Sequence, residues 1–304
     1  MSIFDIFKRK KDNCETKDTV NNSETIKDSN NNNDQFSEMR ERLLSAFKEK
    51  TKTKSYHIDI TEITDGDIFM SKFGGLGYWD NSREYPKDKD GNQLVLLAQI
   101  NFDRDKFDSP LLPTSGLLQF YILPNDLYGA NFDDLLNDGS YKVVLHKNVN
   151  YDVRREDLSN IKTSVTLNED DYFPLTKEFK ISFKETYDYI NPQDARFRDI
   201  LDNVVNEEFS IDVKDVPLYR VFGKGIMDYL YDNLCSSGSK LLGCPYFTQL
   251  DPHENDKYKK YDKLLFQMDS DYKAGILWGK VGIANFFIKD NNNLEDVLYT
   301  WDCE

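Results

Sequence analysis

The sequence is poor in the side chains that most often bind metal ions. Only three histidines occur in 304 residues, and they form no HxH or HExxH pairing. The stretch from Asp88 to Asn92 begins like a calcium-binding loop, but its twelfth position is Gln99, where such a loop needs glutamate. We therefore predict a turn at Asp88–Asn92, no metal site and no cofactor.

Nucleophilic motifs are scarce as well. The four cysteines form no CxxC pair, which predicts reduced thiols in a cytoplasmic protein. The chain has no GxSxG elbow, and Gly223-Lys224-Gly225 lacks the glycine spacing of a phosphate-binding loop. The sequence predicts no catalytic residue, although a pair formed by Cys244 and a histidine stays open at this point.

Long apolar runs are also missing. None is long enough to cross a bilayer, and the first residues do not form a secretory signal, because their apolar side chains precede the basic ones. Residues 1–11 have two interpretations, a helix that docks weakly on a membrane surface or a partner, and a frayed terminus. Residues 13–33 are too polar to offset their ordering entropy, so residues 1–33 are predicted to be a disordered tail.

Positive charge is in deficit, with 39 Lys and Arg against 54 Asp and Glu, a formal net charge of -15. Residues 1–33 hold six charges of each sign, so the excess belongs to the remainder of the chain. An acidic surface repels phosphate backbones, which argues against a nucleic-acid partner, and it attracts basic proteins. The simpler interpretation is that the acidity only keeps the protein soluble.

One pattern of sequence blocks is present twice. The first copy runs from Gly74 to Ile122, and the second begins at Gly243 and ends at Ile288. Equivalent residues keep a nearly constant spacing of 168 or 166 positions: Gly75 and Gly243, Gln99 and Gln267, Pro86 and Pro252, and Gly116 and Gly282. Four blocks in the same order indicate an internal duplication.

The pattern predicts an α+β fold that is β-rich. We expect two internally duplicated, mainly antiparallel sheet units packed together, with a few flanking helices. Strands are predicted at residues 56–60, 93–102, 116–122, 141–145, 163–167, 179–183, 263–269, 276–279, 282–288 and 297–301. Helices are predicted at residues 35–50, 195–205 and 225–234, the first with Asp34 as its N-cap.

The domain organisation follows from these elements. After the tail, residues 34–304 are predicted to form a single domain. Its two related halves span about residues 55–147 and 240–304, joined by a helical insert. The strand at residues 93–102 is apolar on both faces, so it should be central and covered on both sides.

Several blocks together resemble a known family. They include Phe73-Gly74-Gly75 with Tyr78-Trp79, the run from Leu97 to Phe102, the run from Gly116 to Phe120, and Trp278-Gly279. From about Phe73 to the C-terminus, the chain resembles the YwqG family, also called the domain of unknown function DUF1963. The resemblance implies a fold but no reaction, and no catalytic residue is carried over from it. Two departures are Gly77 in place of a usual proline and Lys280 in place of a usual acidic residue.

Polar residues on the otherwise apolar strands are the candidate site. Buried amides need partners, because an unsatisfied polar group costs about 1–3 kcal/mol. One interpretation is an internal network that fixes strand register, and the other is two polar spots lining a ligand-binding cleft between the halves. The residues concerned are Gln99, Asn101, Gln119, Gln267, Asp269 and Asn285.

Two functions from different classes follow. The first is a non-catalytic cytoplasmic protein that binds a protein partner, such as a basic toxin or nuclease in an immunity-type role. The alternative is a small-ligand binder or enzyme that uses the cleft between the halves. The three tryptophans, Trp79, Trp278 and Trp301, are predicted to be core anchors.

Overall fold

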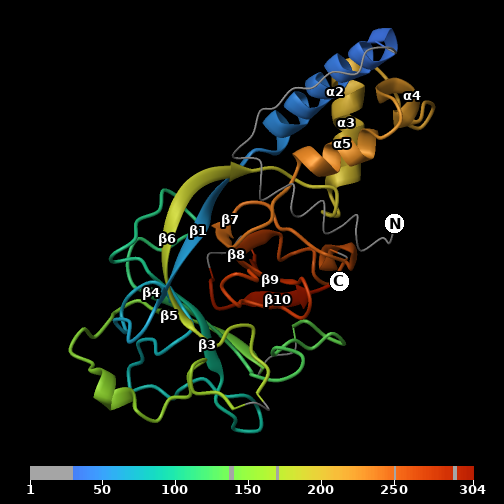
Figure 1. Ribbon diagram of the computed structural model, residues 1–304. Helices are drawn as coiled ribbons and strands as arrows, with labels where there is room; N and C mark the ends of the chain where they lie inside the picture. Colours follow the sequence, from blue (N-terminus) through green and yellow to red (C-terminus); the bar gives the residue numbers. More distant parts are fainter. Residues whose placement is uncertain (1–29, 137–139, 169–170, 250, 290–292) are drawn as a thin grey trace. The chain divides into compact units, whose positions relative to one another are not determined.

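The computed structural model describes residues 30–136, 140–168, 171–249, 251–289 and 293–304, with side chains from Phe36 onward (Figure 1). The chain divides into two compact units. The helical unit comprises residues up to Ser55 together with Thr186–Ser237 and Gly243–Glu254, and the sheet unit comprises Tyr56–Glu185, Gly238–Leu242 and Asn255–Glu304.

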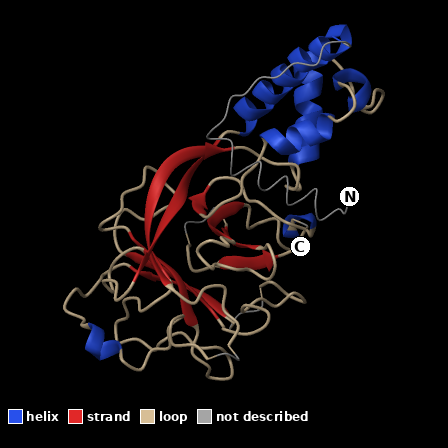
Figure 2. Ribbon diagram, viewed as in Figure 1, coloured by secondary structure: helices blue, strands red, loops and turns tan. Residues whose placement is uncertain are grey.

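The strands, drawn in red in Figure 2, form one ten-stranded sheet in the order β10-β9-β8-β7-β1-β6-β2-β3-β4-β5. The strands are β1 (Thr53–Ile63), β2 (Lys72–Phe73), β3 (Val95–Asn101), β4 (Leu117–Ile122), β5 (Tyr141–His146), β6 (Glu178–Asp188), β7 (Lys240–Leu242), β8 (Lys263–Asp269), β9 (Ile283–Ile288) and β10 (Val297–Asp302). The expectation of two sheet units is corrected to a single sheet, because β1 and β6 lie between the two outer groups of strands. A β-rich α+β fold is confirmed.

The two outer groups of strands have the same pairing pattern. Lys72 of β2 lies opposite Gln99 of β3, and Lys240 of β7 lies opposite Gln267 of β8. The register shifts between Leu96 and Ala98 in β3, and again between Leu264 and Phe266 in β8, which is 168 residues later. Because a bulge and a register are set by local sequence, the repeated blocks produce the same local structure twice.

Strand β3 is buried along its whole length, as its two apolar faces predict. Ala98 and Ile100 belong to a cluster of apolar side chains in the interior of the sheet unit, and Leu94 and Leu96 belong to a second cluster with Tyr78. The β3 strand is therefore covered on both sides, which confirms the prediction for it.

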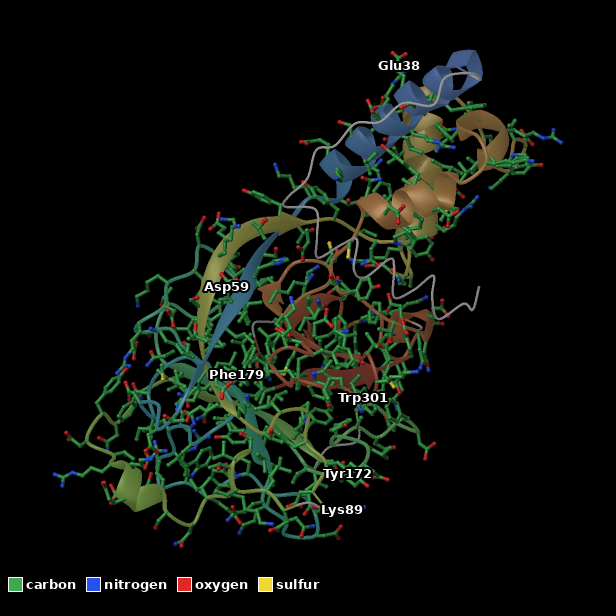
Figure 3. All side chains as sticks on the ribbon, viewed as in Figure 1. Glu38, Asp59, Lys89, Tyr172, Phe179 and Trp301 are labelled. Carbon is green, nitrogen blue, oxygen red and sulfur yellow. The ribbon has the colours of Figure 1, made fainter. Side chains whose placement is uncertain are left out.

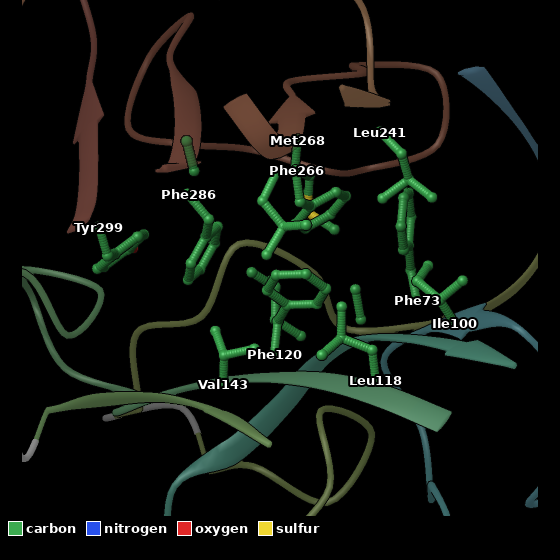
Figure 4. Close-up of a cluster of buried hydrophobic side chains, with 14 of the residues drawn as sticks. Phe73, Ile100, Leu118, Phe120, Val143, Leu241, Phe266, Met268, Phe286 and Tyr299 are labelled. Carbon is green, nitrogen blue, oxygen red and sulfur yellow. The ribbon is translucent and has the colours of Figure 1, made fainter. Parts of the chain in front are cut away.

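Side chains from both outer strand groups fill the interior of the sheet unit (Figure 4). The ring of Phe120 on β4 lies 4.7 Å from that of Phe266 on β8 and 5.0 Å from that of Phe286 on β9. The rings of Tyr141 and Tyr299 are 5.1 Å apart. These aromatic contacts make one shared core from the two groups.

The two end strands of the sheet also contact each other. The Tyr141 hydroxyl on β5 donates to the Leu135 carbonyl at 2.8 Å and also lies 3.3 Å from the Val297 carbonyl on β10. The backbone N–H of Leu145 donates to the carboxylate of Glu295 at 3.2 Å. One backbone group at the outer edge of β5, the Leu145 N–H, is therefore bonded to the chain segment that contains β10.

In the described residues of the helical unit, four α-helices, drawn in blue in Figure 2, pack around an apolar core of their own. They are α2 (Asn30–Thr51), α3 (Phe197–Phe209), α4 (Leu218–Phe222) and α5 (Ile226–Asn233). In this core the rings of Phe47 and Phe197 lie 5.2 Å apart. Three helices were predicted, whereas the five residues of α4 after Pro217 are too few to show a helical period.

Three local predictions are wrong. Residues 163–167 form a turn, because the Thr166 hydroxyl accepts a hydrogen bond from the Thr163 N–H at 2.9 Å and competes with strand pairing. Residues 276–279 make only an isolated bridge between Asp271 and Ile276. Helix α2 begins at Asn30, before the predicted cap at Asp34, although asparagine favours helices poorly.

The remaining predictions concern the N-terminal residues, the cysteines and membrane-spanning helices. The interpretations of residues 1–11 and 13–29 lie outside the described residues, and residues 30–33, which were predicted to belong to the disordered tail, are helical in α2. Cys244 and Cys303 are free thiols, but Cys235 is disulfide-bonded, so the expectation of reduced thiols is wrong for Cys235. Thiols distant in sequence give no signal of which ones meet in the fold. None of the helices in the described part of the chain is long and apolar enough to span a bilayer.

Candidate functional site

Gln99 and Gln119 lie opposite each other on β3 and β4, and both are fully buried. The Gln99 side-chain oxygen accepts hydrogen bonds from the Tyr78 N–H at 3.0 Å and from the Gln119 amide at 2.7 Å. The Gln99 amide nitrogen donates to the carbonyls of Ile68 at 2.9 Å and Met70 at 2.8 Å. Two donors and two acceptor positions are the full capacity of a glutamine side chain, so Gln99 is saturated.

Asn101 ends β3 and fixes the loop that follows it. The Asn101 side-chain oxygen accepts hydrogen bonds from the N–H groups of Asp103 at 2.9 Å and Arg104 at 3.3 Å. Its amide nitrogen donates to the carbonyl of Phe69 at 2.7 Å. The backbone N–H of Asn101 donates to the Ser71 hydroxyl at 2.8 Å.

The amide network continues to His146, at the end of β5. The Gln119 amide nitrogen donates to the Tyr78 carbonyl at 2.6 Å and to Gln99, so its oxygen is left to accept from Nε2 of His146 at 2.8 Å. The other ring nitrogen, Nδ1, then accepts from the guanidinium of Arg83, 3.4 Å away. Burial, and then the positive charge of Arg83, lower the pKa of His146 to about 4, so the ring is neutral at pH 7.

The second half repeats part of this network. The Gln267 amide nitrogen donates to the Gly238 carbonyl at 2.7 Å, as Gln99 does to Met70, which is 168 residues before Gly238. The Asp269 N–H donates to the Ser239 hydroxyl at 3.0 Å, as the Asn101 N–H does to Ser71. The matching bonds hold equivalent strands together in both halves.

Asp269 and Asn285 complete the predicted set. A carboxylate oxygen of Asp269 accepts from the Gly238 N–H at 2.8 Å, and Asp269 is only 6% exposed. Asn285 is buried and lies opposite Gln267 in the β8–β9 ladder. The structure thus brings Gln99 and Gln119 into direct contact and places Gln267 and Asn285 at equivalent register positions.

The amides of the first half lie on one particular face of the sheet. Gln99 and Gln119 contact the segment that contains Ile68 and Tyr78. These two residues belong to the second apolar cluster of the sheet unit, the one that includes Leu94 and Leu96. Their strand neighbours Ala98, Ile100, Leu118 and Phe120 belong to the cluster that fills the shared core. Because side chains alternate along a strand, the amides point away from that core.

A buried ion pair lies beside this network and was not predicted. The ammonium of Lys72 on β2 lies 2.6 Å from a carboxylate oxygen of Glu178 on β6, and the side chains are 0% and 5% exposed. The ammonium also donates to the Leu76 carbonyl at 2.8 Å, and the Gly66 N–H donates to Glu178 at 3.3 Å. Burial lowers the pKa of Lys72, and the bond to Glu178 opposes this effect.

The sequence did hold a signal for this lysine. Lys240 stands 168 residues after Lys72, is also fully buried, and occupies the equivalent place opposite Gln267. A lysine that recurs at the same spacing as the repeated glycines and glutamines indicates a buried position in both copies. Gly75 lies three residues after Lys72 and has φ +66°. A Cβ at this position would lie 2.3 Å from Glu178, so the Lys72–Glu178 pair requires glycine there.

The helical unit contains a second polar cluster. His253 lies with Nδ1 2.5 Å from a carboxylate oxygen of Asp251, and the Ala195 N–H donates to the other oxygen at 2.8 Å. Burial would raise the pKa of Asp251, but the bond and charge of His253 and backbone N–H groups lower it overall. Asp251 is 4% exposed, so its carboxylate is held within the fold by these bonds.

The tryptophans differ in their environments. Trp79 and Trp278 are buried, as expected of core anchors, whereas Trp301 is partly exposed. Within the part of the chain that the structure describes, no three His, Cys, Asp or Glu side chains are grouped so that they could hold a metal ion.

Comparison with protein-family models gives a match over most of the chain. The family model described as Domain of unknown function (DUF1963) matches residues 71–303. None of the curated proteins compared with the chain matches it. The matched range includes every strand that carries a predicted site residue.

Proposed function

Since the chain belongs to the DUF1963 family, a domain of unknown function, we propose that it is a non-catalytic protein that binds a protein partner. The saturated state of the buried Gln99 side chain carries the proposal. Gln99 has four hydrogen-bond partners within the protein and keeps no donor or acceptor for a substrate. The buried polar residues then serve the fold, and function belongs to the surface.

The charge of the chain supports a basic partner. With a formal net charge of -15, the surface attracts proteins of opposite sign over distances of about 8–10 Å at physiological ionic strength. An immunity-type role, in which an acidic protein neutralises a basic toxin or nuclease in the cytoplasm, fits this charge. The same charge opposes binding to nucleic acid.

We also propose that the two strand groups descend from one duplicated unit. The matching registers, the matching bulges and the matching bonds to Ser71 and Ser239 support this origin. The polar residues would then have been kept in both copies because each copy needs them to fix its strand register.

Affinity capture at two salt concentrations tests the binding role. The tagged full chain is used as bait at about 50 mM and about 500 mM NaCl, beside an unrelated acidic protein of similar net charge. We expect a basic protein to be enriched over the control and to bind less at the higher salt concentration. If nothing exceeds the control at either concentration, the proposal fails.

The alternative is a small-ligand binder or enzyme that uses the interior between the two strand groups. The predicted site residues Gln99, Asn101, Gln119, Gln267, Asp269 and Asn285 would be its polar contacts. This alternative has less support, because Gln99 and Gln119 point away from that interior, and Phe120, Phe266 and Phe286 pack against one another within it. Stabilisation of the chain by a metabolite, lost in a Gln267→Ala variant, would favour it.

A further inference from the structure

Aromatic and apolar side chains gather at the surface around the last strand, β10. We call Leu127, Tyr128, Phe132 and Trp301 the Trp301 patch; Trp301 is labelled in Figure 3. Leu127 is 42% exposed and Phe132 is 52% exposed, while Tyr128 and Trp301 are partly exposed. Side chains of this size in one exposed group are typical of a binding surface.

The Trp301 patch is held by the fold beneath it. The ring of Trp301 lies 4.9 Å from that of Tyr128 and 5.8 Å from that of Phe132. The indole N–H of Trp301 donates to the Leu127 carbonyl at 2.7 Å, so its polar atom already has a partner. Tyr128 also packs on the buried ring of Trp278, 5.4 Å away, and this fixes the patch before a partner arrives.

Carboxylates accompany these aromatic rings. The segment 123–136 contains three acidic residues and no basic one, and residues 297–304 contain two acidic residues and no basic one. Asp126 and Asp133 are exposed next to Leu127 and Phe132 in the chain. Asp134 forms an ion pair with Lys257 at 2.7 Å, so Asp126 and Asp133 are the carboxylates that a partner would meet beside the rings.

We propose that the Trp301 patch is the docking surface for a partner segment that carries arginine or lysine beside apolar side chains. Guanidinium groups stack on aromatic rings and bond to carboxylates, so such a segment would use both features of the surface. A second copy of this chain fits less well, because it would bring Asp126 and Asp133 close to like charges. The inference rests on the proposed binding function and assigns its surface.

Variants of the full chain test this surface against matched controls. Phe132→Ala removes a half-exposed ring, and Asp133→Asn removes a charge without changing size. The controls are Tyr219→Ala, a ring that is 50% exposed in the helical unit, and Asp90→Asn, in an exposed turn. Circular dichroism melting should show that all four fold as the unchanged chain does.

The probe is a peptide selected from a phage-displayed random library on the unchanged chain. We expect selected peptides with net positive charge and at least one apolar side chain. By fluorescence anisotropy, Phe132→Ala should weaken binding about tenfold or more, and Asp133→Asn about two- to fivefold at low salt. Tyr219→Ala and Asp90→Asn should bind as the unchanged chain does.

Other results would overturn the assignment. Basic peptides that bind all variants equally would leave the binding function standing but place it elsewhere on the surface. Neutral or acidic peptides, or none, would contradict the chemistry assigned to the patch, and the affinity capture would then decide the binding function alone. A dimer in sedimentation that Phe132→Ala disperses would identify a second copy as the occupant.

Discussion

At the scale of single residues, Gln99 shows how one buried side chain organises its surroundings. Its four hydrogen bonds join two strands and the segment that contains Ile68, Met70 and Tyr78. Replacement by an apolar residue of similar size would leave the Tyr78 N–H and the two carbonyls without this partner inside the protein. Each unsatisfied buried group costs about 1–3 kcal/mol.

We therefore expect Gln99→Leu to lower the free energy of unfolding by about 3 kcal/mol in urea denaturation. The matched variant Gln93→Leu changes a partly exposed glutamine that donates to the Asn160 carbonyl and accepts from the Lys162 N–H. Water can replace these partners, so the variant should cost less than about 1 kcal/mol. Equal losses for the two variants would contradict a structural role for the network.

The lowered pKa of His146 links stability to pH. An unfolded histidine takes up a proton below its ordinary pKa of 6.5, whereas the buried ring resists protonation down to about pH 4. The unfolded state therefore binds more protons between these values, and stability is complete above pH 6.5 and falls as the pH drops toward 4.

Between pH 7 and pH 5, the histidine should account for a loss of about 2 kcal/mol in the free energy of unfolding. His146→Gln keeps a donor for Gln119 but cannot titrate, so it should lose about 2 kcal/mol less over this pH range. Urea denaturation at the two pH values measures the difference, and identical losses in both proteins would disprove the assignment.

The sequence identified the candidate polar residues as a set, but it did not predict the hydrogen-bond partners of each one. Repetition at a fixed spacing identified Gln99 and Gln267, and the apolar runs around them indicated burial. The partners of Gln99 are mostly backbone groups from a segment without regular structure, and sequence patterns give no position for such groups.

At the scale of elements, the short strands β2 and β7 pair with longer strands, and sequence patterns do not predict them. Strand β2 has two residues and β7 has three, too few for an alternation to be visible. The longer strands were predicted to within a few residues, and β8 was predicted with the bounds that it has in the structure. Lys72 shows the consequence, because it was not assigned to a strand and its partner Glu178 was missed with it.

The Lys72–Glu178 pair yields a prediction about β2 and β6. Lys72→Met should cost about 3–5 kcal/mol, because it leaves the Glu178 carboxylate buried without its counter-charge. The double variant Lys72→Met with Glu178→Leu should recover most of this loss, since no isolated charge remains. A double-mutant cycle in urea measures the coupling, and a double variant that is the sum of the singles would argue against the pair.

At the scale of the whole molecule, the acidic excess affects stability as well as binding. A net charge of -15 repels itself in the compact state, and added salt screens this repulsion. We expect the melting temperature to rise by about 2–5 °C between about 20 mM and about 300 mM NaCl. An equal rise with KCl would support screening, and a melting temperature that falls with salt would contradict it.

The sequence predicted which helices and strands are present better than it predicted how the strands pair. Periodicity indicated most strands and three of the helices, because it reports which faces are buried. It did not indicate that β1 and β6 join all the strands into one sheet, because strand partners distant in the chain leave no periodic trace.

The contacts between β5 and β10 restrict how any partner can bind. Exposed strand edges invite other chains to extend a sheet through backbone hydrogen bonds. Here the Leu145 N–H of β5 donates to Glu295, and the Val297 carbonyl of β10 lies 3.3 Å from the Tyr141 hydroxyl, so one backbone group at each terminal edge has a partner within the chain. A strand added at either edge would have to displace such a contact, which favours recognition through side chains and opposes edge-to-edge joining of folded chains.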